Sequence, residues 1–140
     1  MKKYVESGVL RIEWRDFPYQ GQESVNTALA ARAAQEQGKF WEYHDLLYEN
    51  QSSANSGGFS DENLMGLARD AGLDVKKFQK SFQSGKFQEA VQSDFEEGQQ
   101  RGISGTPAFF VNGRALIGLQ PLKTFEQVIE EERRKAEGSS

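Results

Sequence analysis

Apolar and charged residues alternate along residues 9–15, near the start of the chain. The apolar positions are Leu10, Ile12 and Trp14, and the residues between them are charged. Because successive side chains of a strand point to opposite faces, this period of two predicts a strand with one buried face. Pro18 ends the expected strand, since proline cannot donate to a sheet ladder.

Residues 1–7, ahead of this strand, have the character of the last turns of a helix. Gly8 follows at the position of a left-handed cap, a conformation that glycine adopts without steric cost. The expected helix has an end signal but no convincing start signal. We therefore expect that an upstream segment is missing from the chain.

In the middle of the chain, apolar residues recur at spacings of three and four, which is typical of amphipathic helices. Residues 23–37 carry alanines suited to close packing, and residues 40–50 are rich in aromatic residues. Ser60 and Asp74 each stand where a helix N-cap belongs. Three later helices are expected between Ser60 and Gly72, between Asp74 and Gly85, and from Phe87 to near Gly102.

The last third of the chain changes to a strand pattern. Residues 107–111 form a short apolar run, and Asn112 with Gly113 is the strongest two-residue hairpin signal. Residues 115–118 are expected to return as a second strand, and Pro121 suits the first turn of a final helix. The inner face of that helix is expected to carry Leu122, Phe125, Val128 and Ile129. This order of elements predicts an α/β fold with a small sheet flanked by helices.

Composition and charge exclude several classes of protein. The chain has 140 residues, of which 36% are hydrophobic and 27% charged, and this fits one domain. The net charge of -4, with scattered basic residues, argues against a nucleic-acid partner. No apolar run reaches the length of a membrane span. Lys2 and Lys3 are not followed by the apolar stretch of a secretion signal, so the localisation stays unknown.

The sequence contains no cysteine and one histidine, His44. It therefore holds no disulfide or thiol nucleophile of its own, and we expect no metal site and no cofactor. His44 is expected to be packed or hydrogen-bonded, because no serine or cysteine near it completes a nucleophile pair. We accordingly assign no catalytic residue.

Two further groups of side chains are given structural interpretations. The aromatic residues of residues 40–50 are expected in the core, and they include Phe40, Trp41 and Tyr43. The carboxylates near the end of the last middle helix are expected on a solvated surface, and they include Asp94, Glu96 and Glu97. Glu96 and Glu97 are adjacent in the helix and point apart, so they form no catalytic pair.

Residues 40–47 read Phe-Trp-Glu-Tyr-His-Asp-Leu-Leu, and residues 102–113 read Gly-Ile-Ser-Gly-Thr-Pro-Ala-Phe-Phe-Val-Asn-Gly. Both segments resemble the DsbA-like thiol-disulfide oxidoreductases of the thioredoxin superfamily. Residues 15–18 and 34–41 also fit that family, so the resemblance runs in order along nearly the whole chain.

The resemblance implies a single domain over residues 1–140, with a thioredoxin core that carries a helical insertion. Residues 23–102 would form the insertion. Residues 103–136 would hold a cis-proline loop, a β-hairpin and the C-terminal helix.

The resemblance also implies a binding site. The Thr106–Pro107 peptide bond would be cis, and its loop would contact the backbone of a substrate by hydrogen bonds. The expected substrate-binding residues are Ser104, Gly105, Thr106 and Pro107. The expected partner is an extended polypeptide or a thiol protein.

The sequence departs from the family at its redox centre. Family members carry a strand and then Cys-X-X-Cys at the start of a helix, and this chain has neither. We therefore expect a truncated form that is inactive alone. The resemblance also implies that the intact relatives are typically extracytoplasmic. The absent strand would lie between residues 9–15 and residues 108–111. Three solutions are open: the two strands pair directly, a second copy completes the sheet as a domain-swapped homodimer, or a lost segment belongs there.

Two other functions remain as alternatives. One is a non-catalytic thioredoxin-like module that binds peptides or a partner protein. The other is a relative on the same fold, such as a glutathione-dependent isomerase or a kappa-type transferase. Both alternatives share the expected fold and differ in what the site binds.

Overall fold

The middle of the chain, where the sequence predicts helices, forms a unit made almost entirely of helices. The computed structural model describes residues 1–138 and divides the chain into two units. We call Asp16–Gly98 the helical unit, and Met1–Arg15 together with Gln99–Ser140 the sheet unit. The helical unit lies largely within the range 23–102 that the resemblance assigns to an insertion, and the single-domain description of residues 1–140 stays a prediction.

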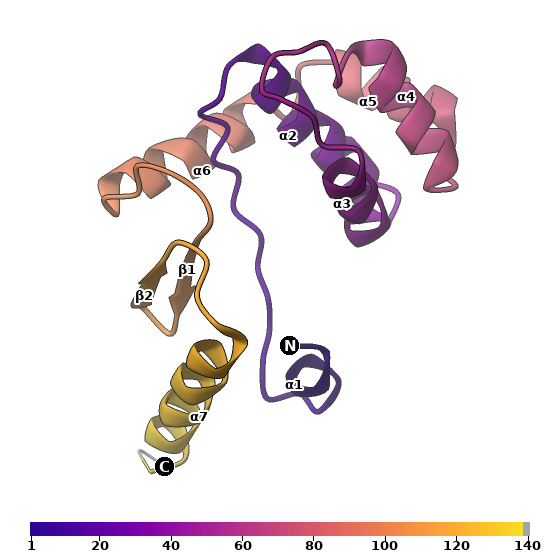
Figure 1. Ribbon diagram of the computed structural model, residues 1–140. Helices are drawn as coiled ribbons and strands as arrows, with labels where there is room; N and C mark the ends of the chain where they lie inside the picture. The colour runs from indigo at the N-terminus through magenta and orange to yellow at the C-terminus, as the bar shows by residue number, and fades with distance from the viewer. Residues whose placement is uncertain (139–140) are drawn as a thin grey trace. The chain divides into compact units, whose positions relative to one another are not determined.

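The helical unit contains the expected helices with small shifts at their ends (Figure 1). Ser60 accepts a hydrogen bond from the Asn63 amide at 3.4 Å, and Asp74 accepts one from the Lys77 amide at 3.0 Å, so both predicted N-caps are confirmed. The helices are α2 (Gln22–Gln35), α3 (Phe40–Glu49), α4 (Asp61–Asp70), α5 (Val75–Gln83) and α6 (Gln88–Gln100), the last of which ends beyond the unit boundary.

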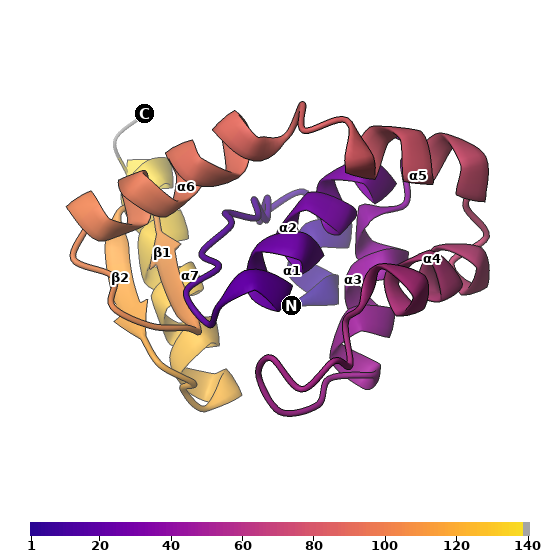
Figure 2. The same cartoon turned by 90° about the horizontal axis from the view of Figure 1, so that it is seen from above.

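Small side chains on α2 let neighbouring helices approach closely. α2 packs against α3, α4 and α5, and Figure 2 shows it beside α3 and α5. Its buried residues are Leu29 and four alanines. Around them lie the fully buried Tyr43, Leu64 and Phe78. The Tyr43 hydroxyl donates to the Leu64 carbonyl at 3.0 Å, which satisfies the one polar atom of that ring in the core.

The sheet unit contains α1 (Lys2–Glu6), β1 (Ala108–Val111), β2 (Arg114–Ile117) and α7 (Leu122–Gly138). β1 and β2 form a two-stranded antiparallel sheet in which Ala108 lies opposite Ile117. Asn112 and Gly113 have φ values of 48° and 87°, so the predicted two-residue turn is confirmed. Gly8, with φ of 74°, caps α1 as expected.

The predicted strand over residues 9–15 is wrong. These residues are extended, but β1 pairs with β2 alone and no other strand is present in residues 1–138. A strand exists only when a neighbour supplies a ladder, and the period of two cannot supply that neighbour. The face expected to be buried is open instead, with Ile12 47% and Trp14 40% exposed.

One inner-face assignment in the final helix is also wrong. Leu122 is 59% exposed, whereas Val128 and Ile129 are buried as expected. Leu122 is the first residue of α7 and precedes the buried Val128 and Ile129 by six and seven positions. None of the helices described in residues 1–138 is both long enough and apolar enough to cross a membrane.

Candidate peptide-binding site

The loop between α6 and β1 holds the four residues expected to bind substrate. Gly102, with φ of 77°, turns the chain out of the end of α6. Ser104, Thr106 and Pro107 are exposed, and Gly105 is half-buried. The Thr106–Pro107 peptide bond is cis, the isomer that the resemblance implies.

The loop joins directly onto the hairpin. The Gly118 amide donates to the Pro107 carbonyl at 2.8 Å, which closes the open end of the β1–β2 pair next to the loop. Gln120 donates from its side-chain amide to the Ile117 carbonyl at 2.9 Å. The position of the loop next to the hairpin is therefore defined, although Ser104, Thr106 and Pro107 are exposed to solvent.

Three loop residues have spare hydrogen-bonding capacity. Within residues 1–138, Ser104, Gly105 and Thr106 form no hydrogen bond with other groups of the chain. Their backbone amides and carbonyls are therefore not used by the fold of the described residues. A row of such groups beside a strand edge can pair with the backbone of an extended peptide.

α7 supports the hairpin from one side. The Phe109 ring meets the Phe125 ring edge-on, with 4.8 Å between centroids, and β1 packs against α7 (Figure 2). Arg114 of β2 pairs with Glu131 of α7. The hydrogen bond from Arg114 lowers the pKa of the Glu131 carboxyl below its ordinary value of 4.5. The ion pair adds a polar link to the apolar contact between strand and helix.

A cavity of about 320 Å³ lies near the turn end of β1, inside the sheet unit. Its lining combines apolar and charged side chains, which include Val9, Leu10, Val111, Ile129, Glu132 and Arg133. The open space therefore separates the start of the extended segment from β1. Residues 9–15 and β1, which were expected to flank the absent strand, do not pair directly, so the first of the three open solutions does not occur.

Contacts of α1 hold the start of the extended segment on α7. Lys3 pairs with Glu126 at 3.0 Å, and the hydrogen bond that its ammonium donates to that carboxylate raises the pKa of Lys3. Burial raises the pKa of Tyr4, a residue that is 9% exposed. The amides of Val9 and Leu10 both donate to the Tyr4 carbonyl at 3.0 Å. Beyond Leu10 the segment continues extended through residue 15 (Figure 1).

The structure corrects one carboxylate assignment in the helical unit. Asp94 was expected on the surface but is buried, because Arg32 of α2 bonds its carboxylate at 2.6 Å. Arg32 also bonds the buried Asp16 at 2.7 Å, and the Asp16 amide donates to Asp94 at 3.0 Å. Sequence reasoning missed this triad because its members lie far apart in the chain. Arginine and carboxylates at unrelated spacings carry no local signal.

A second correction concerns α3. Tyr43 is buried as expected and Phe40 is half-buried, but Trp41 is 46% exposed. His44 is hydrogen-bonded as expected, since its Nδ1 lies 2.9 Å from Asp45. Within residues 1–138, no group of three His, Cys, Asp or Glu side chains is placed to hold a metal ion.

Comparison with known proteins decides the family. A thioredoxin family model, Thioredoxin_4, matches residues 1–131. The chain belongs to this thioredoxin family. Its fold is thioredoxin-like, rich in helices and with a small two-stranded sheet, as the sequence predicts.

Curated relatives differ in length and in kind. The chain is 28% identical over 116 residues to a probable disulfide bond formation protein D of Bacillus anthracis, a match that covers 80% of this chain and 54% of the relative. It therefore spans about half the length of that relative. It is 34% identical over 125 residues to a Na(+)/H(+) antiporter NhaA of Herminiimonas arsenicoxydans, covering 89% of this chain and 19% of the antiporter.

Solved structures support the same fold. A thioredoxin-like oxidoreductase from Silicibacter pomeroyi is 27% identical, with a TM-score of 0.73 over 86% of this chain and 66% of its own. The thiol-disulfide exchange protein alpha-DsbA2 from Wolbachia pipientis is 21% identical, with a TM-score of 0.80 over 93% of this chain and 69% of its own, and this likeness concerns the fold alone. By homology, the chain is related to the thiol-disulfide oxidoreductases.

Proposed function

We propose that this chain is the polypeptide-binding part of a thiol-disulfide oxidoreductase domain and that it does not exchange disulfides by itself. Thiol-disulfide exchange needs a thiolate that attacks a disulfide sulfur. The sequence has no cysteine to supply one. The observation that supports the binding role is the exposed loop of residues 104–107, which continues directly into the edge of β1.

The proposed ligand is an extended polypeptide. Ser104, Gly105 and Thr106 would offer backbone groups to it, and Pro107 would form the end of the platform. Main-chain hydrogen bonds give affinity without strong sequence preference, which suits a protein that meets many thiol substrates. No cofactor is needed for this binding.

An insulin-reduction assay tests the catalytic half of the proposal. Dithiothreitol reduces insulin slowly, and an active oxidoreductase shortens the lag before the insulin chains precipitate. The purified chain is expected to leave the lag unchanged, whereas a cysteine-containing thioredoxin shortens it. Turnover by preparations free of other cysteine proteins would contradict the proposal.

A binding assay tests the other half. The double variant S104R/T106R places two bulky side chains on the loop and is expected to weaken binding of an unfolded, carboxymethylated polypeptide by about tenfold or more. The matched control is S53R/A54R, which adds the same side chains to the exposed loop between α3 and α4. Equal affinity of the two variants would remove residues 104–107 from the site.

We further propose that the chain is a truncated form whose sheet is completed by a strand from outside residues 1–140. The free edge of β1 and the unpaired backbone of Ile12 and Glu13 support this, because unpaired strand edges attract further strands. A lost segment of the same protein or a second copy of the chain could supply the strand. Reading the gene upstream separates them: an in-frame segment with Cys-X-X-Cys supports the lost segment.

A second copy makes its own prediction about mass. If a domain-swapped homodimer completes the sheet, light scattering coupled to size-exclusion chromatography gives twice the monomer mass of 15.8 kDa. A monomer at all concentrations excludes the dimer and leaves the lost segment.

A non-catalytic binding module is the second candidate function. The match to 19% of a Na(+)/H(+) antiporter supports it, because there a similar region forms a small part of a different kind of protein. A gene that starts at Met1, without an upstream cysteine motif, would favour the module over truncation. Retention on a glutathione column would instead favour a glutathione-dependent relative.

A further inference from the structure

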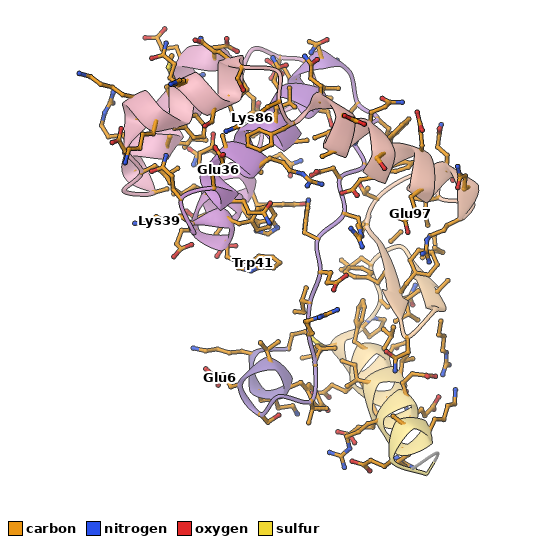
Figure 3. All side chains as sticks on the ribbon, turned by 180° about the vertical axis from the view of Figure 1, so that it is seen from behind. Glu6, Glu36, Lys39, Trp41, Lys86 and Glu97 are labelled. Carbon is orange, nitrogen blue, oxygen red and sulfur yellow. The ribbon has the colours of Figure 1, made fainter. Side chains whose placement is uncertain are left out.

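Three aromatic rings form a continuous line along α3, in which the half-buried His44 lies between the exposed Trp41 and Tyr48. Trp41, His44 and Tyr48 follow one another at spacings of three and four, which places them on one helix face. The Trp41 and His44 ring centroids lie 5.3 Å apart, and those of His44 and Tyr48 lie 4.7 Å apart. We call these three residues the aromatic ladder. Figure 3 labels Trp41, whose side chain projects from α3 away from the other helices of this unit.

The ladder is separate from the core face of the same helix. α3 contributes the fully buried Tyr43 to the core, with Leu46 and Leu47 partly buried beside it. In contrast, Trp41 is 46% and Tyr48 56% exposed. Isolated exposed apolar residues are ordinary, but contiguous ones mark interaction surfaces. Core packing of the helical unit therefore accounts for the half-buried His44, whose ring also packs on Phe40, but not for Trp41 and Tyr48.

A line of carboxylates runs beside the ladder. Glu42, Asp45 and Glu49 repeat the spacing of the aromatic residues, shifted by one position along the chain. α3 contains no lysine or arginine. Asp45 holds the His44 ring at 2.9 Å, whereas Glu42 and Glu49 form no ion pair within residues 1–138. The Lys39 ammonium, just before the helix, donates to the Ala71 carbonyl at 3.0 Å.

The surrounding unit is acidic as well. Residues 16–98 contain 14 acidic and 7 basic residues, so most of the negative charge of the chain falls in the helical unit. A surface of this kind attracts cations and repels anionic polymers. Charge complementarity thus selects the class of partner.

We propose that the ladder and its carboxylates bind a basic segment of a partner polypeptide. Arginine or lysine side chains would lie on the faces of Trp41 and Tyr48, where the negative face of an aromatic ring attracts a cation. Their charged ends would pair with Glu42 and Glu49 by charge-assisted hydrogen bonds. This site is in the helical unit and does not depend on the loop of residues 104–107.

Isothermal titration of the full chain with a capped hexa-arginine peptide tests the proposal at low salt. We expect binding that weakens as salt rises, because exposed charges are screened. The W41A/Y48A variant is expected to bind at least about fivefold more weakly, and E42Q/E49Q at least about threefold more weakly, since each exposed contact contributes little alone. A hexa-glutamate peptide is expected not to bind.

Two control variants isolate the surface. W14A removes the other tryptophan, which lies in the sheet unit, and E89Q removes an exposed carboxylate of α6. Both are expected to bind hexa-arginine as the parent does, and circular dichroism verifies that every variant is folded. Parent-like affinity of W41A/Y48A would overturn the proposal. So would equal binding of hexa-glutamate, or binding to anionic lipid vesicles in place of the peptide.

Discussion

Gly98 of α6 lies against the ring of Phe17 inside the helical unit. A Cβ atom added to Gly98 would lie 2.6 Å from Cδ2 and 2.8 Å from Cε2 of that ring. Phe17 cannot move freely, because its ring packs on Phe95 with 4.7 Å between centroids. We therefore expect Gly98→Ala to lower the free energy of unfolding by about 1–3 kcal/mol, measured by urea denaturation.

Gly66 provides the matched control for this substitution. It lies inside α4, and an added Cβ would meet no heavy atom within 4 Å. Gly66→Ala is expected to raise the free energy of unfolding by about 0.5–1 kcal/mol, since alanine is the better helix former. If both substitutions shift stability in the same direction, the contact with Phe17 is not what decides the effect.

Arg32 of α2 links two buried carboxylates. The Asp16 side chain is 2% exposed and that of Asp94 10%, and Arg32 bonds both. Removing the guanidinium takes away a cation that bonds both buried carboxylates, so Arg32→Ala is expected to cost about 3 kcal/mol or more in urea denaturation. Lys86→Ala is the control, because the Lys86–Glu36 pair is exposed and is expected to contribute less than about 1 kcal/mol.

At the scale of residues, the sequence predicted well where the environment is local. The cap at Asp74 and the turn at Asn112 follow from the chemistry of neighbouring backbone groups. It predicted wrongly at Asp94 and Trp41. Whether a carboxylate is buried depends on a partner elsewhere in the chain, and an aromatic residue alone does not say which face of its helix meets the core.

At the scale of elements, one ion pair links β2 to α7. The bond from Arg114 lowers the pKa of Glu131, so the pair stabilises the fold above the ordinary carboxyl pKa of 4.5. That contribution is lost as the pH falls through the lowered value, because a protonated carboxyl no longer attracts the guanidinium. We expect Glu131→Gln to show a smaller fall in Tm between about pH 5.5 and 3.5 than the parent chain.

Calorimetry tests this prediction by comparing how the Tm of the parent chain and the Tm of Glu131→Gln change with pH. At neutral pH the variant is expected to have the lower Tm, and at the acid end the two Tm values should converge. Since both side chains are about half exposed, high salt should reduce the difference. Parallel profiles at all pH values would show that the pair contributes nothing to the pH dependence.

The sequence predicts an element correctly when the signal for that element lies in neighbouring residues. The helices from α2 to α7 appear where apolar spacing and caps predict them, because a helix satisfies its own backbone hydrogen bonds. The hairpin is also predictable, since its turn brings the two strands together. The state of residues 9–15 is not predictable, because an extended segment becomes a strand only when a partner strand pairs with it, and no local pattern supplies that partner.

At the scale of the whole molecule, the extended residues 9–15 are the expected site of proteolysis. Arg11 and Arg15 lie there, and the Arg11 side chain is 86% exposed. Backbone that is extended and lacks a ladder fits a protease cleft, so limited trypsin digestion is expected to cut first after these two residues. Mass spectrometry should identify fragments that begin at Ile12 and Asp16.

The double variant R11Q/R15Q is the control for this digestion. It removes both cleavage sites without changing the backbone pattern and should slow the appearance of the first large fragment. Cleavage that starts inside the helical unit at the parent rate would mean that residues 9–15 are protected. The supply of a strand to the edge of β1 should also slow cleavage in residues 9–15.

The sequence alone determined the family of this protein, its helices, its hairpin and the absence of a thiol. Each of these depends on residue types and short-range spacing, which the chain carries wherever it folds. Only the tertiary structure decided that residues 9–15 have no ladder, that Arg32 joins Asp16 to Asp94, and that Trp41 and Tyr48 face outward. These features depend on contacts between residues that are far apart in the sequence, and no pattern along the chain specifies such contacts.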